Sequence, residues 1–235
     1  MLPPTAVADL MIYAYWTASA RAAHEGRSVY AHPGGGTRIG ETLSRRPVQV
    51  LSDPAYPGLE SQGFVTASTS GDSASVFDNG LPLERTSWVQ DGRLAALGQT
   101  RETAGLTGQA ATPMIGNLVV DVTGAEVSTL DDLVAGVDEG LLVTCLWYIR
   151  EVDPQTLLLT GLTRDGVYRV EGGEVVGEVT NFRFNESPID LLDRFSQASL
   201  TVPTFSREWG DYFPRTAMPA LRVPDFNMST VSQAQ

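Results

Sequence analysis

The sequence lacks lysine altogether and has very little cysteine or histidine. All 16 basic residues among the 235 are arginine, so chemistry that needs a lysine, such as Schiff-base formation or a phosphate-binding P-loop, is excluded. The single cysteine, Cys145, cannot form a disulfide within the chain or build a cysteine-rich zinc site. The two histidines, His24 and His32, are too few for a metal site with three histidine ligands.

Long apolar runs and basic clusters are also missing. The longest apolar runs, such as residues 140–146, are too short to cross a bilayer, and Met1–Asp9 lacks the basic start of a signal peptide. The net charge is −12, from 28 acidic and 16 basic residues. This balance argues against nucleic-acid binding and against docking on anionic lipid, because both need clustered positive charge. We therefore expect a cytoplasmic protein that contacts neither nucleic acid nor membrane.

The chain does contain enough apolar sequence for a core. Hydrophobic residues make up 42% and charged residues 19%, which excludes wholesale disorder. The stretch from Thr5 to about His24 predicts one helix, with Thr5 as its cap and Gly26 just past its end. Residues 10–16 are apolar on nearly every face, so we expect this N-terminal helix to be buried.

From about Val48 the signals are typical of β-structure. The dipeptides Asn79-Gly80 and Asp91-Gly92 predict turns, the second of them within a hairpin. A strongly apolar strand is expected over Leu141–Ile149. A tight meander is expected over residues 156–179, with turns at Asp165-Gly166 and Gly172-Gly173.

Two shorter helices are also predicted. Ser128-Thr129-Leu130-Asp131 is a capping box for a helix to about Glu139, and Ser187-Pro188 starts another that should run to about Ala198. The tail from Pro203 is rich in proline and predicts only short edge strands and loops. No repeat or linker divides the chain. The pattern predicts an α+β fold with a mostly antiparallel β-sheet, in a single domain over residues 1–235.

Three groups of side chains could carry chemistry. His24-Glu25 begins like a zinc-peptidase helix, but the second histidine that should follow one turn later is absent. Glu151 and Asp153 could act as paired carboxylates, although solvated acids at a strand end are the plainer interpretation. Cys145 lies in apolar sequence, which predicts a buried and unreactive thiol.

Several longer strings resemble one known family. They are Phe77–Thr86 (FDNGLPLERT), Gly140–Pro154 (GLLVTCLWYIREVDP), Leu162–Tyr168 (LTRDGVY), Asn181–Pro188 (NFRFNESP) and the ending Asp225–Ser229. These strings are similar to the C-terminal region of the TldD/PmbA family, and most of all to its TldE (PmbA-like) branch. The resemblance covers most of the chain. It implies the C-terminal domain of that family, with the family's N-terminal domain absent from this chain.

The resemblance implies bacterial, cytoplasmic proteolysis by a pair of chains. In this family a TldD chain holds zinc on an HExxxH helix completed by a later cysteine, and a TldE chain pairs with it without metal ligands. When the first helices are aligned, the three motif positions are Met11, Ile12 and Trp16, none of which can bind zinc or act as a general base. No HExxxH occurs in the sequence, and no cysteine follows Phe205. The resemblance therefore implies no catalytic residue, metal ligand or cofactor in this chain, with zinc in its partner.

Three hypotheses follow for the function. The first is a non-catalytic TldE-type subunit of a zinc metalloprotease, which forms a heterodimer with an HExxxH chain and helps to degrade or process unfolded or extended peptides. The second is a stand-alone homodimer that binds peptides or serves as a scaffold without protease activity. The third is a hydrolase in its own right that uses His24, Glu25 and His32.

Overall fold

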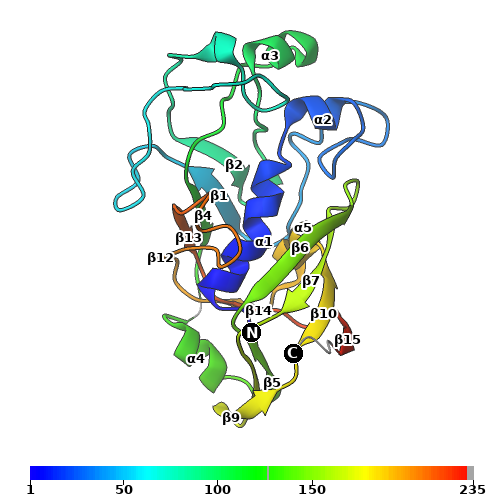
Figure 1. The fold of residues 1–235 in the computed structure, drawn as a ribbon, viewed down its shortest axis with the longest axis vertical. Coiled ribbons are helices and arrows are strands. Elements are labelled where there is room, and N and C mark those ends of the chain that lie inside the picture. The colour runs from blue at the N-terminus through cyan, green and yellow to red at the C-terminus, as the bar shows by residue number, and fades with distance from the viewer. Residues whose placement is uncertain (126, 232–235) are drawn as a thin grey trace.

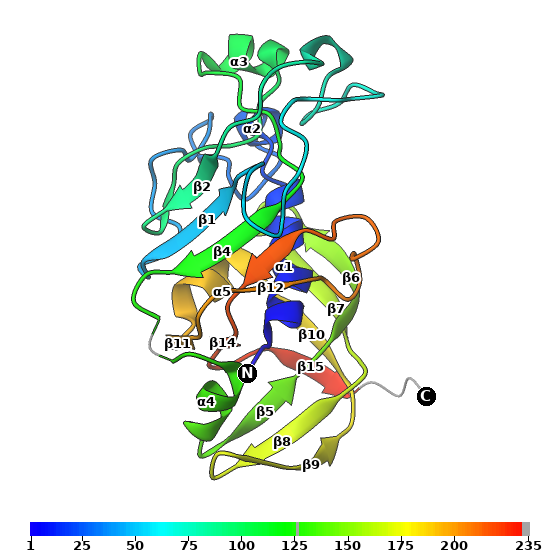
Figure 2. The ribbon, with the colours of Figure 1, turned by 90° about the vertical axis from the view of Figure 1, so that its left-hand side faces the viewer.

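Helix α1 (Pro4–Trp16) runs through the middle of the molecule, between layers of β-structure (Figure 1, Figure 2). The computed structural model describes residues 1–125 and 127–231. In the view of Figure 1, β12 (Val202–Thr204) and β13 (Thr216–Met218) pack on the left of α1 and β6 (Leu146–Asp153) on its right. Nine residues of α1 are buried, because a helix that is apolar all round is stable only when it is covered on every side. The prediction of a buried N-terminal helix is confirmed.

A six-stranded sheet covers one side of α1. Its order is β12-β13-β4-β1-β2-β3, with β1 at Val48–Ser52, β2 at Thr86–Gln90, β3 at Arg93–Leu94 and β4 at Leu118–Val122. Neighbouring strands are antiparallel except β13 and β4, which are parallel. β13 therefore lies inside the sheet, although the tail was predicted to hold only edge strands. Its three residues include no proline, so their backbone can pair on both sides.

The hairpin predicted at Asp91-Gly92 joins β2 and β3. Both turn residues have positive φ, 48° for Asp91 and 75° for Gly92, as a two-residue hairpin turn of this kind requires. A Cβ atom on Gly92 would lie only 2.0 Å from the carbonyl oxygen of Ser44. The predicted turn at Asn79-Gly80 is also present, directly after the short 3-10 helix η1 (Val76–Asp78).

A three-stranded antiparallel meander lies on the other side of α1. Each of its three strands is bent, so that the meander has a lower half and an upper half. In Figure 2 its lower half is the sheet β5-β8-β9, and its upper half belongs to the sheet β15-β10-β7-β6. The remaining bounds are β5 at Glu139–Val143, β7 at Leu158–Thr163, β8 at Val167–Glu171, β9 at Glu174–Val179, β10 at Phe182–Glu186 and β15 at Met228–Val231.

Strand pairing continues through the bend of this meander. Val143 pairs with Val167 in the lower half, and Leu146 pairs with Thr163 in the upper half. The hydrogen bonds between these pairs run from the Thr144 N–H to the Gly166 carbonyl and from the Arg164 N–H to the Cys145 carbonyl, both at 3.1 Å. β5 and β6 are therefore two limbs of one strand, and so are β7 and β8.

This geometry refines one prediction and corrects another. The strand expected over Leu141–Ile149 is present but divided into β5 and β6, because the chain bends at Thr144-Cys145 and enters a second sheet. The turn expected at Asp165-Gly166 is a bulge in which Asp165 has a φ of 54° and no partner in the ladder, so the chain keeps its direction. The turn at Gly172-Gly173 does reverse the chain, between β8 and β9.

The helix predicted from Thr5 to His24 is in fact two helices, α1 and α2 (Ala20–His24). The backbone between them pairs with Gly98, which accepts from the Ala20 N–H at 2.9 Å and donates to the Ala18 carbonyl at 2.7 Å. In one continuous helix, the Ala18 carbonyl and the Ala20 N–H would bond within the helix and could not pair with Gly98. The break is therefore set by a residue far away in the sequence.

The caps of these helices agree only in part with the prediction. α1 begins with Pro4 after Pro3 as its cap residue, and the Thr5 hydroxyl instead donates to the Thr144 carbonyl at 3.3 Å. Thr5 is therefore not the cap. Gly26 follows the end of α2 with a φ of 77°, as predicted for a glycine that ends a helix.

Helix α4 (Leu130–Ala135) starts with a capping box, one residue later than predicted. Thr129 and Asp132 exchange the two hydrogen bonds, in place of Ser128 and Asp131. The helix ends well before Glu139, because that residue already belongs to β5.

Helix α5 (Pro188–Arg194) begins at Ser187-Pro188 as predicted, but it stops before Ala198. Gln197–Ala198 form β11, which pairs with β14 (Leu221–Arg222). Helix α3 (Arg101–Thr107) was not predicted, although Thr100 accepts a capping hydrogen bond at its start.

Candidate functional site

Aromatic side chains gather where the C-terminal end of α1 meets the tail of the chain. The Trp16 ring lies 5.2 Å from the Trp209 ring and 6.3 Å from Phe213, between centroids. Tyr13 lies 6.1 Å from Trp209, and Tyr212 lies 5.9 Å from it. We call these five side chains the aromatic cluster. Trp16 is 38% exposed and Tyr212 is 78% exposed, and exposed Trp and Tyr are typical of surfaces that contact another molecule.

A buried carboxylate ties the tail segment that carries Trp209 to α1. Asp9 Oδ1 accepts hydrogen bonds from the Ser206 hydroxyl at 2.6 Å, the Arg207 N–H at 2.7 Å and the Glu208 N–H at 3.1 Å. Burial raises the pKa of Asp9 to about 6, and these hydrogen bonds oppose the rise. The sequence analysis missed this anchor. Its signal was present, because Asp9 is the only charged residue in α1.

Strand β6 is linked to the aromatic cluster through Ile149, next to Tyr148, which lies in a bulge with a φ of 55°. This conformation is strained for a bulky side chain, and neighbouring contacts hold it in place. The Ile149 N–H donates to the Glu208 carboxylate at 2.9 Å, and its carbonyl accepts from the Tyr13 hydroxyl at 2.8 Å. The Arg150 guanidinium lies 4.6 Å above the Tyr148 ring. Because side chains occupy both backbone groups of Ile149, an added strand cannot use them.

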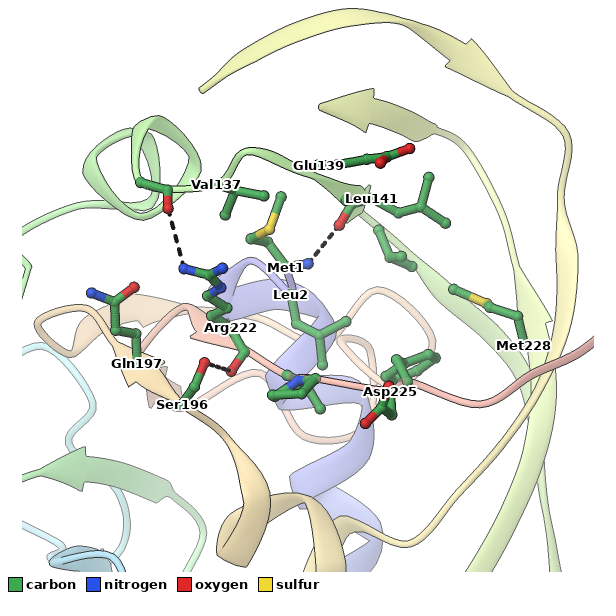
Figure 3. A pocket seen from close by; sticks show the side chains of 16 residues that line it. Met1, Leu2, Val137, Glu139, Leu141, Ser196, Gln197, Arg222, Asp225 and Met228 are labelled. Atoms are coloured by element: carbon green, nitrogen blue, oxygen red, sulfur yellow. Dashed lines mark hydrogen bonds between the residues drawn. The ribbon is translucent and has the colours of Figure 1, made fainter. Parts of the chain in front are cut away.

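A large cavity lies at the opposite end of α1 (Figure 3). It has a volume of about 750 Å³ and is enclosed by Met1, β5 and the segment Arg222–Met228. Arg222 donates to the Gly136 carbonyl at 3.2 Å, and the Met1 nitrogen donates to the Leu141 carbonyl at 2.5 Å. Since α1 is about 20 Å long at 1.5 Å per residue, this cavity is remote from the aromatic cluster.

Comparison with known proteins identifies the family. A family model described as the PmbA/TldA metallopeptidase C-terminal domain matches residues 1–230. The chain belongs to this family. The resemblance inferred from the sequence strings is thereby confirmed.

Solved structures share the fold of this PmbA/TldA chain. TldE from Thermococcus kodakarensis superposes with a TM-score of 0.71 at 18% identity, over 98% of this chain and 49% of that one. A proposed modulator of a DNA gyrase from Thermotoga maritima gives 0.73 at 19% identity, over 94% and 47%. One from Bacteroides thetaiotaomicron gives 0.69 at 18% identity, over 94% and 44%. The chain thus spans less than half the length of these relatives. No match is found among curated proteins.

The PmbA/TldA chain has three positions that the sequence analysis assigned to a degenerate zinc helix. Met11 and Ile12 are buried in the core, whereas Trp16 belongs to the aromatic cluster. The tail after Phe205, where a third ligand would be expected, packs against Trp16 through Trp209. The two segments that the resemblance singled out are therefore neighbours in space, and indole rings lie between them. The alignment of the three positions stays a prediction.

The histidines lie apart from this region, at the surface. His24 is exposed at the end of α2, and Glu25 forms ion pairs with Arg21 and Arg27. His32 Nε2 lies 3.6 Å from a carboxylate oxygen of Glu41. Within residues 1–125 and 127–231, no three His, Cys, Asp or Glu side chains are grouped so that they could hold a metal ion.

The surroundings of the other candidate side chains, Cys145 and Asp153, do not indicate a catalytic role. Cys145 is buried, as predicted, and burial raises the pKa of its thiol to about 12. It lies in the bend between β5 and β6, not in the middle of a strand. Asp153 accepts from the Thr156 hydroxyl at 2.7 Å, which lowers the pKa of Asp153 and supports the turn after β6. None of the described helices is long and apolar enough to cross a membrane.

Proposed function

We propose that this chain is a non-catalytic subunit of TldE type in a TldD/TldE-like zinc metalloprotease. It pairs in the cytoplasm with a TldD-type chain that carries HExxxH. Its role is to complete the site and to hold an unfolded or extended peptide against the partner's zinc. The proposal includes no catalytic residue and no cofactor in this chain.

The contact between Trp16 and Trp209, with ring centroids 5.2 Å apart, is the observation that carries the proposal. It joins the helix and the tail that would supply metal ligands in a catalytic member of the family. Indole rings offer no lone pair suited to zinc. Family membership over residues 1–230 supports the assignment to a peptidase system.

Exposed aromatic side chains on the tail and on β6 support a role in holding peptide. Tyr148, Phe205 and Tyr212 are each more than half exposed. Aromatic faces bind apolar side chains of many kinds, which suits a subunit that handles varied sequences. Strand addition at Ile149 is blocked, so contact with peptide side chains would carry more of the affinity at this position.

Co-purification tests the proposal. The chain is expressed together with the HExxxH protein of its own genome, and the two are expected to co-elute at a fixed ratio. Peptidase activity and bound zinc should both require the partner, and both should survive His24→Ala and His32→Ala in this chain. A stable symmetric dimer with no affinity for the HExxxH protein would support the homodimer instead. Stoichiometric zinc and peptidase activity in this chain alone would establish an independent hydrolase.

A further inference from the structure

A second cavity, of about 500 Å³, is closed on one side by the long loop between β1 and β2. Two limbs of this loop run side by side, because Phe64 and Pro82 form an antiparallel bridge. Beyond the limbs the chain turns over in residues 68–75, which we call the loop tip. Residues 73–75 of the loop tip line the cavity. The loop tip is therefore part of the cavity wall.

The loop tip adds nothing to the hydrophobic core. None of its residues belongs to an apolar cluster of the described core. Its sequence, STSGDSAS, consists of small and polar residues, and its one buried residue is Ser75. Burial of apolar surface is the dominant favourable contribution to folding, and segments that lack it open at a low free-energy cost. Polar contacts must therefore hold the loop tip in place.

Asp72 is the one charged residue of the loop tip, and its polar contacts lead to α2 and the residues beside it. Its carboxylate lies 2.9 Å from the Arg27 guanidinium and 3.9 Å from that of Arg21. Its carbonyl accepts from the Ser19 hydroxyl at 3.4 Å. Within the described part of the chain, the other hydrogen bonds of the loop tip stay inside residues 70–78. Asp72 therefore fastens the loop tip to α2.

This fastening can be released at a low cost. Arg21 and Arg27 also pair with Glu25, at 3.2 and 2.6 Å, so both guanidiniums keep a partner when Asp72 leaves. The four side chains are between 35% and 51% exposed. Ion pairs at such exposed positions contribute little to stability, and salt screens them. The contact of the loop tip with α2 should therefore weaken as the ionic strength rises.

The base of the loop is held more firmly than its tip. Asp78 is buried, and its carboxylate accepts from Arg101 Nε at 2.8 Å and from the Arg101 backbone N–H at 3.2 Å. The Asn79 side chain exchanges two hydrogen bonds with the Ala67 backbone, at 2.5 and 3.0 Å. Movement is therefore confined to the loop tip, which lies beyond both of these contacts.

We propose that the loop tip is a lid over this cavity, held closed by the ion pairs of Asp72 with Arg21 and Arg27. The lid opens when these pairs are screened or removed. Opening joins the cavity to solvent along the side formed by residues 73–75. All parts of this device belong to the one chain, so the inference depends neither on the proposed function nor on a partner.

A thiol placed in the wall of the cavity measures the opening of the lid. Ser75 is buried and lines the cavity, so Ser75→Cys should react with a disulfide reagent only while the lid is open. Ser68→Cys, at an exposed position of the same loop tip, reports the reactivity of an uncovered thiol. At low salt, about 20 mM NaCl, we expect Ser75→Cys to be labelled at least about tenfold more slowly than Ser68→Cys.

Removing the charge of Asp72 should open the lid. Added to Ser75→Cys, Asp72→Asn is expected to raise the labelling rate about fivefold at low salt. Raising NaCl to about 500 mM should have a similar effect when Asp72 is intact and should add little in Asp72→Asn. Asp131→Asn, at an exposed acid on α4, is the matched control and should leave the rate unchanged.

The buried thiol of Cys145 separates opening of the lid from unfolding of the chain. It should stay unlabelled while the lid opens. If Asp72→Asn also makes Cys145 reactive, the ion pairs stabilise the whole fold and the inference is overturned. Equal labelling of Ser75→Cys and Ser68→Cys, or the absence of either the Asp72→Asn effect or the salt effect, would overturn it as well. The proposed function is judged separately, by co-elution with the HExxxH protein.

Discussion

Asp9 and Ser206 are separated by 197 residues in the chain, yet the Ser206 hydroxyl donates a 2.6 Å hydrogen bond to the Asp9 carboxylate. The contact lies inside the molecule, where α1 meets the segment that leads to Trp209. Because the same carboxylate oxygen also accepts the Arg207 and Glu208 N–H groups, Asp9 fixes the backbone of this segment. The position of the aromatic cluster thus depends on one buried acid.

The pH dependence of stability should report on Asp9. Burial raises the pKa of Asp9 in the folded chain to about 6 from 3.8, so between about pH 4 and 6 the folded state holds a proton that the unfolded state has released. Stability from this group is therefore highest below pH 4 and declines as the pH rises to about 6. Relative to Asp9→Asn, the wild type should lose up to about 3 kcal/mol between pH 4 and 7.

Urea unfolding of both proteins at pH 4.5, 5.5 and 7 measures this difference. Asn keeps one oxygen that can accept from Ser206, but it cannot ionise. Using the difference between the two proteins removes the contribution of the other carboxyl groups. A constant difference across these pH values would show that Asp9 does not titrate in this range.

Trp209→Ala should destabilise the chain by about 2–3 kcal/mol, because it removes the ring that links Trp16, Tyr13 and Tyr212 and leaves a cavity. Tyr212→Ala is the matched control. Its side chain is 78% exposed, so the loss should stay below about 0.5 kcal/mol. Thermal unfolding followed by circular dichroism measures both. Similar losses for the two variants would mean that the cluster does not contribute to stability through packing.

Gly92→Ala should cost on the order of 3 kcal/mol, since φ is positive and the added carbon would lie 2.0 Å from the Ser44 carbonyl oxygen. Gly63→Ala provides the comparison, because nothing lies within 4 Å of a Cβ atom there. Chemical denaturation of both variants tests the expectation. If Gly92→Ala is as stable as Gly63→Ala, the geometry of the β2–β3 hairpin is wrong.

The Cys145 thiol should react very slowly in the folded protein. Burial raises its pKa to about 12, and the thiolate is the reactive form. With a disulfide reagent at pH 8, labelling should take at least a hundred times longer in buffer than in 6 M guanidinium chloride. Fast labelling of the native chain would place Cys145 at the surface.

Local signals in the sequence predicted the features that depend on few neighbouring residues. The hairpin turn requires a positive φ at both of its central residues, and Asp91 and Gly92 are residue types that adopt one, so these two residues predict the hairpin. The buried state of α1 follows from its apolar composition. Ser187-Pro188 likewise marks the start of α5, because a proline in the first turn suits only that position.

Features that depend on distant residues could not be predicted in this way. The break after α1 exists because Ala18 and Ala20 pair with Gly98, and nothing near residue 18 encodes that partner. The Asp165 bulge has the sequence of a turn, and only the pairing of its flanking residues shows that the chain continues. At the candidate site, the approach of Trp16 to Trp209 and the choice of Ser206 as a partner of Asp9 arise from tertiary packing, although the lone charge of Asp9 in α1 indicates that it needs a partner.

The bent meander links the strand register of its two sheets, β5-β8-β9 and β15-β10-β7-β6. Side chains alternate between the faces of a strand, so sliding a strand by one residue along its partner exchanges every inward and outward side chain. The strand made of β5 and β6 and its partner made of β8 and β7 each run through both sheets, so a slip in one sheet would pass into the other unless the bulge at Asp165 absorbed it. The short connection after Asp153, in which Leu157 has a φ of 50°, therefore helps to set the strand register in both sheets of the meander.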